Sequence, residues 1–259
     1  MRIGVILRLV PDLGEDIEFN ADGTALDMEW IDLKPNEYDE QALEEAILIA
    51  GVVGAEVVAM ALAGDGVDKM LRTARAKGAA RSVRIACDDE CPQDSAQMAP
   101  VLVAAARALD IDLLLTGVQA ANDATGPLAG RLAALLDWPS ACAVAGVTAE
   151  AGRITVRQEY AGGRAAMVSL TLPAVLGIQS ASAPMRYVSG SKMGEAMRAP
   201  LEELSIQAEW GDPGFRALAL ASNVAQRRAE MIEGAPDVIA ARLRDLLAER
   251  GLWPGNVAP

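Results

Sequence analysis

Residues 113–139 read LLLTGVQAANDATGPLAGRLAALLDWP and predict a buried strand, a polar glycine-bearing loop and a helix. We expect the strand at 113–116 and the loop at 117–126, with Thr125 capping the helix and Pro127 in its first turn. Such a loop presents free backbone N–H groups at the carboxyl end of a parallel sheet, where α/β proteins hold phosphate. It has neither a Walker lysine nor a G-x-G-x-x-G pattern, so an ordinary strand–helix turn is the alternative interpretation.

The residues before this stretch alternate between strands and helices. Continuous apolar runs predict strands at 3–9, 56–62 and 83–86. Apolar spacing predicts a helix that Asn36 caps and Gly51 or Gly54 ends, and further helices at 67–78 and 95–109. A weak alternation around Asp22-Gly23 predicts a small hairpin at 16–27.

This alternation implies right-handed crossovers and a Rossmann-like parallel sheet with helices on both faces. The loops after Leu9, Leu62 and Thr116 then lie at one edge of the sheet, which favours a shared ligand site.

The pattern changes after Pro139. Short strands with glycine-containing turns are predicted at 144–148, 153–159, 166–172 and 174–178, as a small antiparallel extension. The segment 184–200 is polar, and 201–226 has no firm period, so we interpret it as an extended arm. The arm ends in an amphipathic helix at 236–250, which Gly251 stops.

The composition excludes several classes of function. With no histidine among 259 residues, Ser-His-Asp and Cys-His catalysis and histidine metal sites are ruled out. A net charge of -13 makes nucleic acid and anionic membrane poor partners. No apolar run has the roughly 18 residues of a membrane span, so no direct membrane insertion is expected. The odd count of three cysteines suggests a reducing compartment, and the alanine-rich, charged composition suggests a bacterial cytoplasmic protein.

Several collinear pieces carry a family resemblance. They are RIGVILRLVPD (2–12), PNEYDEQALEEA (35–46), LRTARAKGAA (71–80), TGVQAANDATG (116–126), LLDWP (135–139), EYAGG (159–163), LPAVLGIQ (172–179), RYVSGSKMGEAMRAP (186–200) and RRAEMIEG (227–234). Together they resemble the beta subunit of electron transfer flavoprotein, a family that includes the nitrogen-fixation-linked flavoprotein subunits.

The resemblance implies a heterodimer with an alpha subunit, which mainly holds a shared FAD. The beta subunit of the family usually holds a structural AMP, and bifurcating relatives hold a second FAD there. The complex takes electrons from a flavin dehydrogenase donor and passes them to an acceptor such as a quinone oxidoreductase. The flavin supplies the chemistry, so an electron carrier and not an enzyme is expected.

The resemblance also implies a cofactor-binding set. Its members are Ile6, Asn36, Tyr38, Asp39, Leu62, Gly117, Val118, Gln119, Asn122, Asp123, Thr125, Gly126 and Leu128. Asp123 and Asn36 would orient AMP, and Tyr38 would lie toward the alpha subunit's flavin. The sequence departs from the family near the end of the loop. The family often has Asn or Gly, then Gln, then Thr or Val, whereas this chain has Gly126, Pro127 and Leu128, and Pro127 cannot donate a backbone hydrogen bond.

The resemblance divides the chain into three parts. Residues 1–185 would form the nucleotide-binding domain with its extension, and 186–200 a partner-recognition loop. Residues 201–259 would be an arm whose helix packs on the partner subunit. The residues expected to bind the partner are Met185, Arg186, Gly190, Lys192 and Met193, and Gly190 stands where the family has an anchoring leucine.

Two other interpretations were weighed. A stand-alone adenine-nucleotide binder resembling the stress proteins accounts for 1–139, but it leaves the extension, arm and terminal helix unexplained. A classical enzyme has no catalytic constellation to support it.

Overall fold

The computed structural model describes residues 1–14, 17–29, 31–86, 91–92, 94–123, 126–150, 152–213, 217–221 and 231–253. The chain divides into two compact units, Met1–Leu220 and Ala221–Pro259. None of the helices in the described part is long and apolar enough to cross a membrane.

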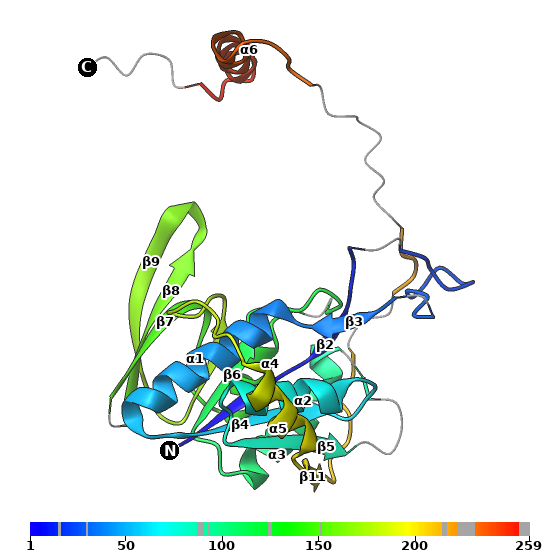
Figure 1. Ribbon diagram of the computed structural model, residues 1–259, viewed down its shortest axis with the longest axis vertical. Coiled ribbons are helices and arrows are strands. Elements are labelled where there is room, and N and C mark those ends of the chain that lie inside the picture. Colours follow the sequence, from blue (N-terminus) through cyan, green and yellow to red (C-terminus); the bar gives the residue numbers. More distant parts are fainter. Residues whose placement is uncertain are drawn as a thin grey trace. The chain divides into compact units, whose positions relative to one another are not determined.

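A nine-stranded sheet forms the centre of the first unit, in the order β11-β5-β4-β1-β6-β10-β7-β8-β9 (Figure 1). The parallel strands are β1 (Arg2–Ile6), β4 (Glu56–Leu62), β5 (Arg81–Ala86), β6 (Leu113–Gly117), β7 (Ser140–Glu150), β10 (Ala174–Ile178) and β11 (Glu202–Ser205). The antiparallel strands β8 (Arg153–Tyr160) and β9 (Arg164–Thr171) follow β7, and a short turn, η1 (Ala161–Gly163), joins them. The predicted Rossmann-like sheet and antiparallel extension are confirmed.

Helices cover both faces of the sheet and create two cores. On one face, α1 (Glu37–Val53) and α2 (Val67–Lys77) pack on Ile3 and Val5 of β1. On the other, α3 (Ser95–Ala108) and α4 (Leu128–Leu136) pack on Ile6. The central strands are buried on both faces, which explains their continuous apolar sequence.

The chain between β1 and α1 contains a small sheet that the sequence did not predict. Strands β2 (Leu9–Pro11) and β3 (Leu33–Pro35) pair antiparallel. The first strand therefore ends at Ile6 and not near Leu9. The excursion between β2 and β3 contains a bridge from Phe19 to Leu26, in agreement with the predicted hairpin.

Strand β10 was predicted in the antiparallel extension but lies between β6 and β7, parallel to both. Its five residues are all buried, whereas exposure alternates along β9. An unbroken apolar run is the pattern of a strand covered on both faces, so β10 belongs to the parallel part of the sheet.

The segment 184–200 is not a loop throughout. It contains α5 (Gly190–Arg198), whose N-cap Ser189 accepts a hydrogen bond from the Lys192 amide. Gly190 and Gly194 both lie within this helix. The helix packs on α2, where Met193 contacts Thr73.

The expected arm begins with a strand. β11 pairs with the edge of β5, and the ion pairs Arg81–Glu202 and Arg84–Glu203 join the two strands. In the second unit, α6 (Pro236–Glu249) confirms the predicted terminal helix, and Val238 and Leu243 are exposed on it. The odd count of three cysteines predicts a reducing compartment, whereas in the structure Cys91 is disulfide-bonded.

The central core should be sensitive to loss of volume. Leu114 in β6 is fully buried, so Leu114→Ala should lower the free energy of unfolding by about 2–5 kcal/mol. Leu135→Ala is the control, because Leu135 on α4 is 49% exposed, and it should change that free energy by less than about 0.5 kcal/mol. Urea unfolding of both variants tests this, and equal losses would contradict the assignment of Leu114 to the core.

Candidate functional site

The carboxyl ends of β1 and β6 form the topological switch point of the sheet. These strands are neighbours, yet the chain after β1 leads to α1 on one face and the chain after β6 leads to α4 on the other. A crevice at such a switch point is where α/β proteins bind ligands.

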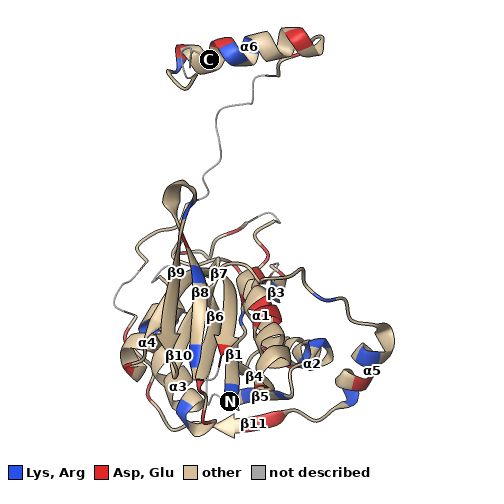
Figure 2. Cartoon of the chain, turned by 90° about the vertical axis from the view of Figure 1, so that its left-hand side faces the viewer, with Lys and Arg blue, Asp and Glu red and all other residues tan. Residues whose placement is uncertain are grey.

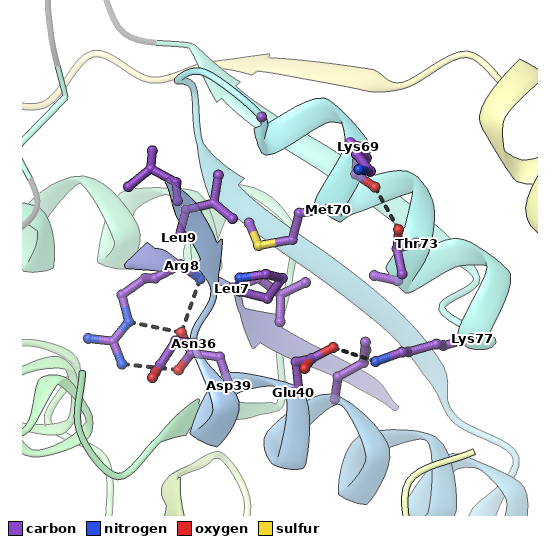
Figure 3. A pocket seen from close by; sticks show the side chains of 15 residues that line it. Leu7, Arg8, Leu9, Asn36, Asp39, Glu40, Lys69, Met70, Thr73 and Lys77 are labelled. Atoms are coloured by element: carbon purple, nitrogen blue, oxygen red, sulfur yellow. Dashed lines mark hydrogen bonds and ion pairs between the residues drawn. The ribbon is translucent and has the colours of Figure 1, made fainter. Parts of the chain in front are cut away.

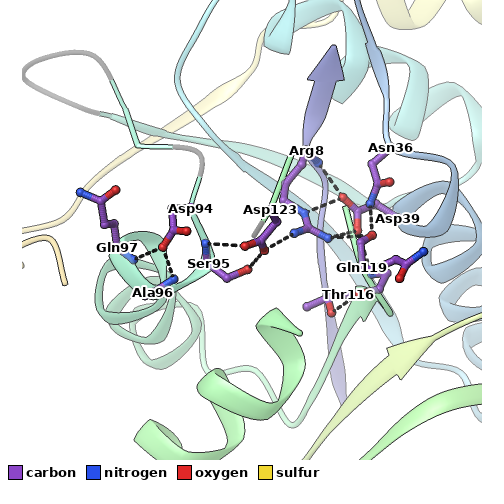
Figure 4. Close-up of polar contacts among 11 residues, drawn as sticks. Arg8, Asn36, Asp39, Asp94, Ser95, Ala96, Gln97, Thr116, Gln119 and Asp123 are labelled. Atoms are coloured by element: carbon purple, nitrogen blue, oxygen red, sulfur yellow. Dashed lines mark hydrogen bonds and ion pairs between the residues drawn. The ribbon is translucent and has the colours of Figure 1, made fainter. Parts of the chain in front are cut away.

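A buried ion pair lies at this switch point (Figure 4). Arg8 follows β1, and its Nε and Nη2 each lie 3.0 Å from a carboxylate oxygen of Asp39 in the first turn of α1. The Arg8 amide also donates to Asp39 Oδ2 at 3.0 Å. The two side chains are only 5% and 1% exposed, so the bidentate pair is formed away from water.

Asp39 also joins α1 to the end of β6. Its Oδ1 accepts a hydrogen bond from the Gly117 amide at 2.8 Å. A Cβ on residue 117 would lie 2.5 Å from Asp39 Oδ1 and 2.6 Å from Tyr38 Cβ, so only glycine permits this contact.

Asp123 extends the network to α3. One of its oxygens lies 3.6 Å from Arg8 Nη1, and its carboxylate accepts from the amide and hydroxyl of Ser95, the first residue of α3. Burial alone would lower the pKa of Arg8, but Asp39 and Asp123 outweigh that effect and the pKa is raised. Arg8 therefore stays charged, and its buried Nη1 has no hydrogen-bond acceptor among the described residues.

A second set of contacts links Asn36, Gln119 and Tyr38. Asn36 occupies the N-cap position of α1 as predicted, but its side chain does not cap. Its Nδ2 instead donates to the Gln119 carbonyl at 2.9 Å. Gln119 Nε2 lies 3.5 Å from the Tyr38 hydroxyl, so these residues join the loop after β6 to the start of α1.

The other predicted cofactor residues lie in different surroundings and do not join this network. Ile6, Leu62 and Leu128 belong to one apolar cluster beneath the crevice, on the side of α3 and α4. The Val118 amide donates to the Ile178 carbonyl, and Asn122 is half-buried in the loop. Thr125 lies outside the described residues.

The N-terminus of α4 is open. Pro127 occupies its N-cap position and not its first turn, and no side chain of a described residue caps the helix. Gly126 has a φ of 99°, and neither it nor Gly130 has any atom within 4 Å of where a Cβ would be. Uncapped N–H groups beside open space suit an anion.

A separate cavity of about 280 Å³ opens between α1 and α2 (Figure 3). Leu7, Leu43 and Met70 are among the apolar residues that line it, and the Glu40–Lys77 ion pair lies beside it. Asn36 and Asp39 also line it, but no described residue of the loop 117–128 does, so it differs from the ligand site expected from sequence.

Four of the five predicted partner-binding residues lie at the surface, exposed or half-buried. Met185 is 42% exposed, Gly190 and Lys192 are exposed, and Met193 is half-buried against α2. Arg186 differs, because its guanidinium turns inward to Glu44. The sequence analysis missed Tyr187, which is 92% exposed.

The sequence-based prediction of the site also missed Arg8 and Ser95. An arginine at the end of an apolar first strand was the available signal for Arg8, because such a residue falls at the ligand edge of the sheet. For Ser95 the sequence offered no comparable signal.

In the described part of the chain, no three His, Cys, Asp or Glu residues are grouped so as to hold a metal.

The sheet order and the polar network at its switch point define a Rossmann-like α/β protein, a fold in which ligands bind at the switch point. Residues 27–208 match the electron transfer flavoprotein domain. The chain therefore belongs to the electron transfer flavoprotein family.

Similar relatives are beta subunits of electron transfer flavoprotein. The protein from Methylophilus methylotrophus is 31% identical over 96% of this chain and 98% of its own length. The one from Bacillus subtilis (strain 168) is 30% identical over 85% of this chain and 86% of its own length. The one from Sus scrofa is 28% identical over 95% of this chain and 98% of its own length. The similarity thus spans both units of the chain.

Asp39→Asn should be strongly destabilising. It removes one charge of a buried pair and leaves the Arg8 guanidinium poorly compensated, at an expected cost of about 3–5 kcal/mol in the free energy of unfolding. Asp12→Asn breaks an exposed pair with Lys34 and should leave the urea midpoint unchanged. A stable Asp39→Asn protein would show that the network does not hold the crevice together.

Proposed function

We propose that this chain is the beta subunit of a heterodimeric electron transfer flavoprotein. The observation that carries the proposal is the 31% identity to a beta subunit over 96% of this chain. In the proposed complex an alpha subunit pairs with this chain, a flavin dehydrogenase donates electrons, and a quinone oxidoreductase is the acceptor. A cytoplasmic location is part of the same proposal.

FAD would be held mainly by the alpha subunit, with this chain forming one side of its site. When bound, the flavin accepts and releases the electrons. This chain would contribute positioning: Tyr38 is half-buried at the start of α1, held by the contact to Gln119 and by the tight packing of Asp39 on Gly117. No residue of this chain is needed as a proton donor or acceptor.

We further propose that the crevice holds AMP with a structural role. Two features fit its phosphate: the buried Nη1 of Arg8 lacks an acceptor, and the N-terminus of α4 is uncapped beside open space. Backbone groups of Gly126, Leu128 and Ala129 would bind the phosphate, since Pro127 has no N–H. Ile6 and Leu62 would provide an apolar surface for the base.

Co-expression with the alpha subunit from the neighbouring reading frame tests the function. A yellow 1:1 complex is expected, which a flavin dehydrogenase reduces and an acceptor quinone oxidoreductase reoxidises. The chain expressed alone should be colourless, because FAD is held mainly by the partner. A stable monomer that retains FAD tightly by itself would overturn the proposal.

The AMP site has its own test. Gly130 is exposed in the first turn of α4, so Gly130→Asp places a carboxylate where it repels phosphate, whereas Gly130→Ala fills the same open space without charge. Mass spectrometry of denatured complex should find AMP with wild type and Gly130→Ala and less AMP with Gly130→Asp, at equal FAD. Two FAD per heterodimer and no AMP would instead support the bifurcating alternative.

A further inference from the structure

The chain after β11 returns along the edge of the sheet at which the crevice lies. Strand β11 runs parallel to β5, so the chain leaves it at the carboxyl edge, where Ile6 and Gly117 also end their strands. From there it reaches first α3 and then the excursion between β2 and β3 (Figure 1). We call its described residues, 206–213 and 217–220, the strap.

The strap begins on the apolar cluster beneath the crevice. Ile206 is half-buried against the cluster that contains Ile6 and Leu62, the last residues of β1 and β4. These two residues are the ones proposed to face the base of the nucleotide. Because the sheet order is β11-β5-β4-β1, a chain that runs from β11 to the excursion after β1 passes the carboxyl ends of β5 and β4.

The strap next contacts a wall of the crevice, the first turn of α3. The Gly211 amide donates to the Gln97 carbonyl at 2.9 Å. Ser95, two residues before Gln97, donates to Asp123, the carboxylate that faces Arg8 (Figure 4). One turn of helix therefore binds both the strap and the buried network.

A proline in α3 prepares the surface on which Gly211 lies. Pro100 has no N–H, so the Ala96 carbonyl four residues before it lacks the usual hydrogen bond of a helix. Gly211 packs on that carbonyl so closely that a Cβ on residue 211 would overlap its oxygen. The atoms it would meet are helix backbone, which cannot give way as a flexible side chain can. Glycine is therefore required at 211 for the strap to lie on α3.

The far end of the strap is held weakly. The Leu220 amide donates to the Gly23 carbonyl, in the turn of the excursion, at 2.7 Å. The side chains of Leu218 and Leu220 are 84% and 40% exposed, so little apolar area stabilises this end. Strand β11 is held more firmly, by its ladder with β5 and by glutamates that lie beside the arginines of β5 (Figure 2). The strap can therefore detach while β11 stays paired.

We propose that the strap is a gate over the nucleotide crevice, and that the nucleotide enters and leaves only while Gly211 and Leu220 are detached. This inference rests on the proposed function, in which the crevice holds AMP. The two backbone hydrogen bonds that anchor the strap go to α3 and to the excursion, and not to the groups proposed to bind phosphate. A gate with the same affinity for ligand when open and closed changes the rate of exchange and not the dissociation constant.

The first test uses Gly211→Ala in the heterodimer, with Gly51→Ala as the control. The added methyl group overlaps the Ala96 carbonyl at 211, whereas at 51 in α1 it meets no atom within 4 Å. Gly211→Ala should speed both the release of bound AMP and the uptake of isotope-labelled AMP about tenfold, with an unchanged dissociation constant. Amide hydrogen exchange over 206–213 should quicken by a similar factor, because the strap opens more often. Gly51→Ala should change none of these quantities.

A second pair of variants tests the far end, and serves if Gly211→Ala folds poorly. Leu220→Pro removes the amide that donates to Gly23, whereas the Leu218 amide makes no hydrogen bond to a described residue. Leu220→Pro should therefore speed the exchange of AMP, and Leu218→Pro should leave it at the wild-type rate.

The outcomes separate the gate from the nucleotide site. Unchanged exchange in both Gly211→Ala and Leu220→Pro, in complexes that contain AMP, would overturn the gate and leave the proposed AMP site standing. Faster release with slower uptake would show that the strap binds the nucleotide, and it would overturn the gate as well. If the wild-type complex contains no AMP, the proposed AMP site fails, and the gate with it.

Discussion

The buried guanidinium of Arg8 is the constraint on which the rest of the first unit depends. A charge at this depth is tolerated only because Asp39 and Asp123 face it from two directions. Asp39 lies at the start of α1, and Asp123 lies in the loop after β6 and contacts the start of α3. One side chain just after β1 thereby sets where two helices begin relative to the central strands. The crevice at the switch point follows from that arrangement, since its walls are these same three elements.

The architecture was largely predictable because buried parallel strands and amphipathic helices leave different periods in a sequence. Strand 56–62 and the helices that became α2 and α3 were predicted almost to the residue. The failures have physical causes. The apolar run of β10 does not reveal its neighbours, which are decided by tertiary packing. The segment of α5 has glycines and a polar composition that suggest a loop, but packing on α2 and the Ser189 cap make it helical.

The candidate site was predictable in location more than in chemistry. The family resemblance named Asn36, Asp39, Gly117 and Asp123, and the rule that loops at one sheet edge converge predicted that such residues lie together, as their contacts with Arg8 and with one another show. It could not show that Asp39 and Asp123 are already engaged by Arg8, because the partners are 31 or more positions apart in the chain. Asn36 illustrates the same limit: its N-cap position is local and was predicted, whereas its amide contact with Gln119 depends on how β6 meets α1.

The position of β11 has a consequence for biosynthesis. This strand covers the outer edge of β5, yet it is the last strand of the first unit to be translated. While the ribosome makes everything from α3 to α5, β5 presents unpaired backbone groups that another chain can pair with. Arg81 and Arg84 project from that edge strand, and later bind Glu202 and Glu203. Before β11 arrives, the same two positive charges keep identical nascent chains apart, so the residues that complete the sheet also protect it while it is incomplete.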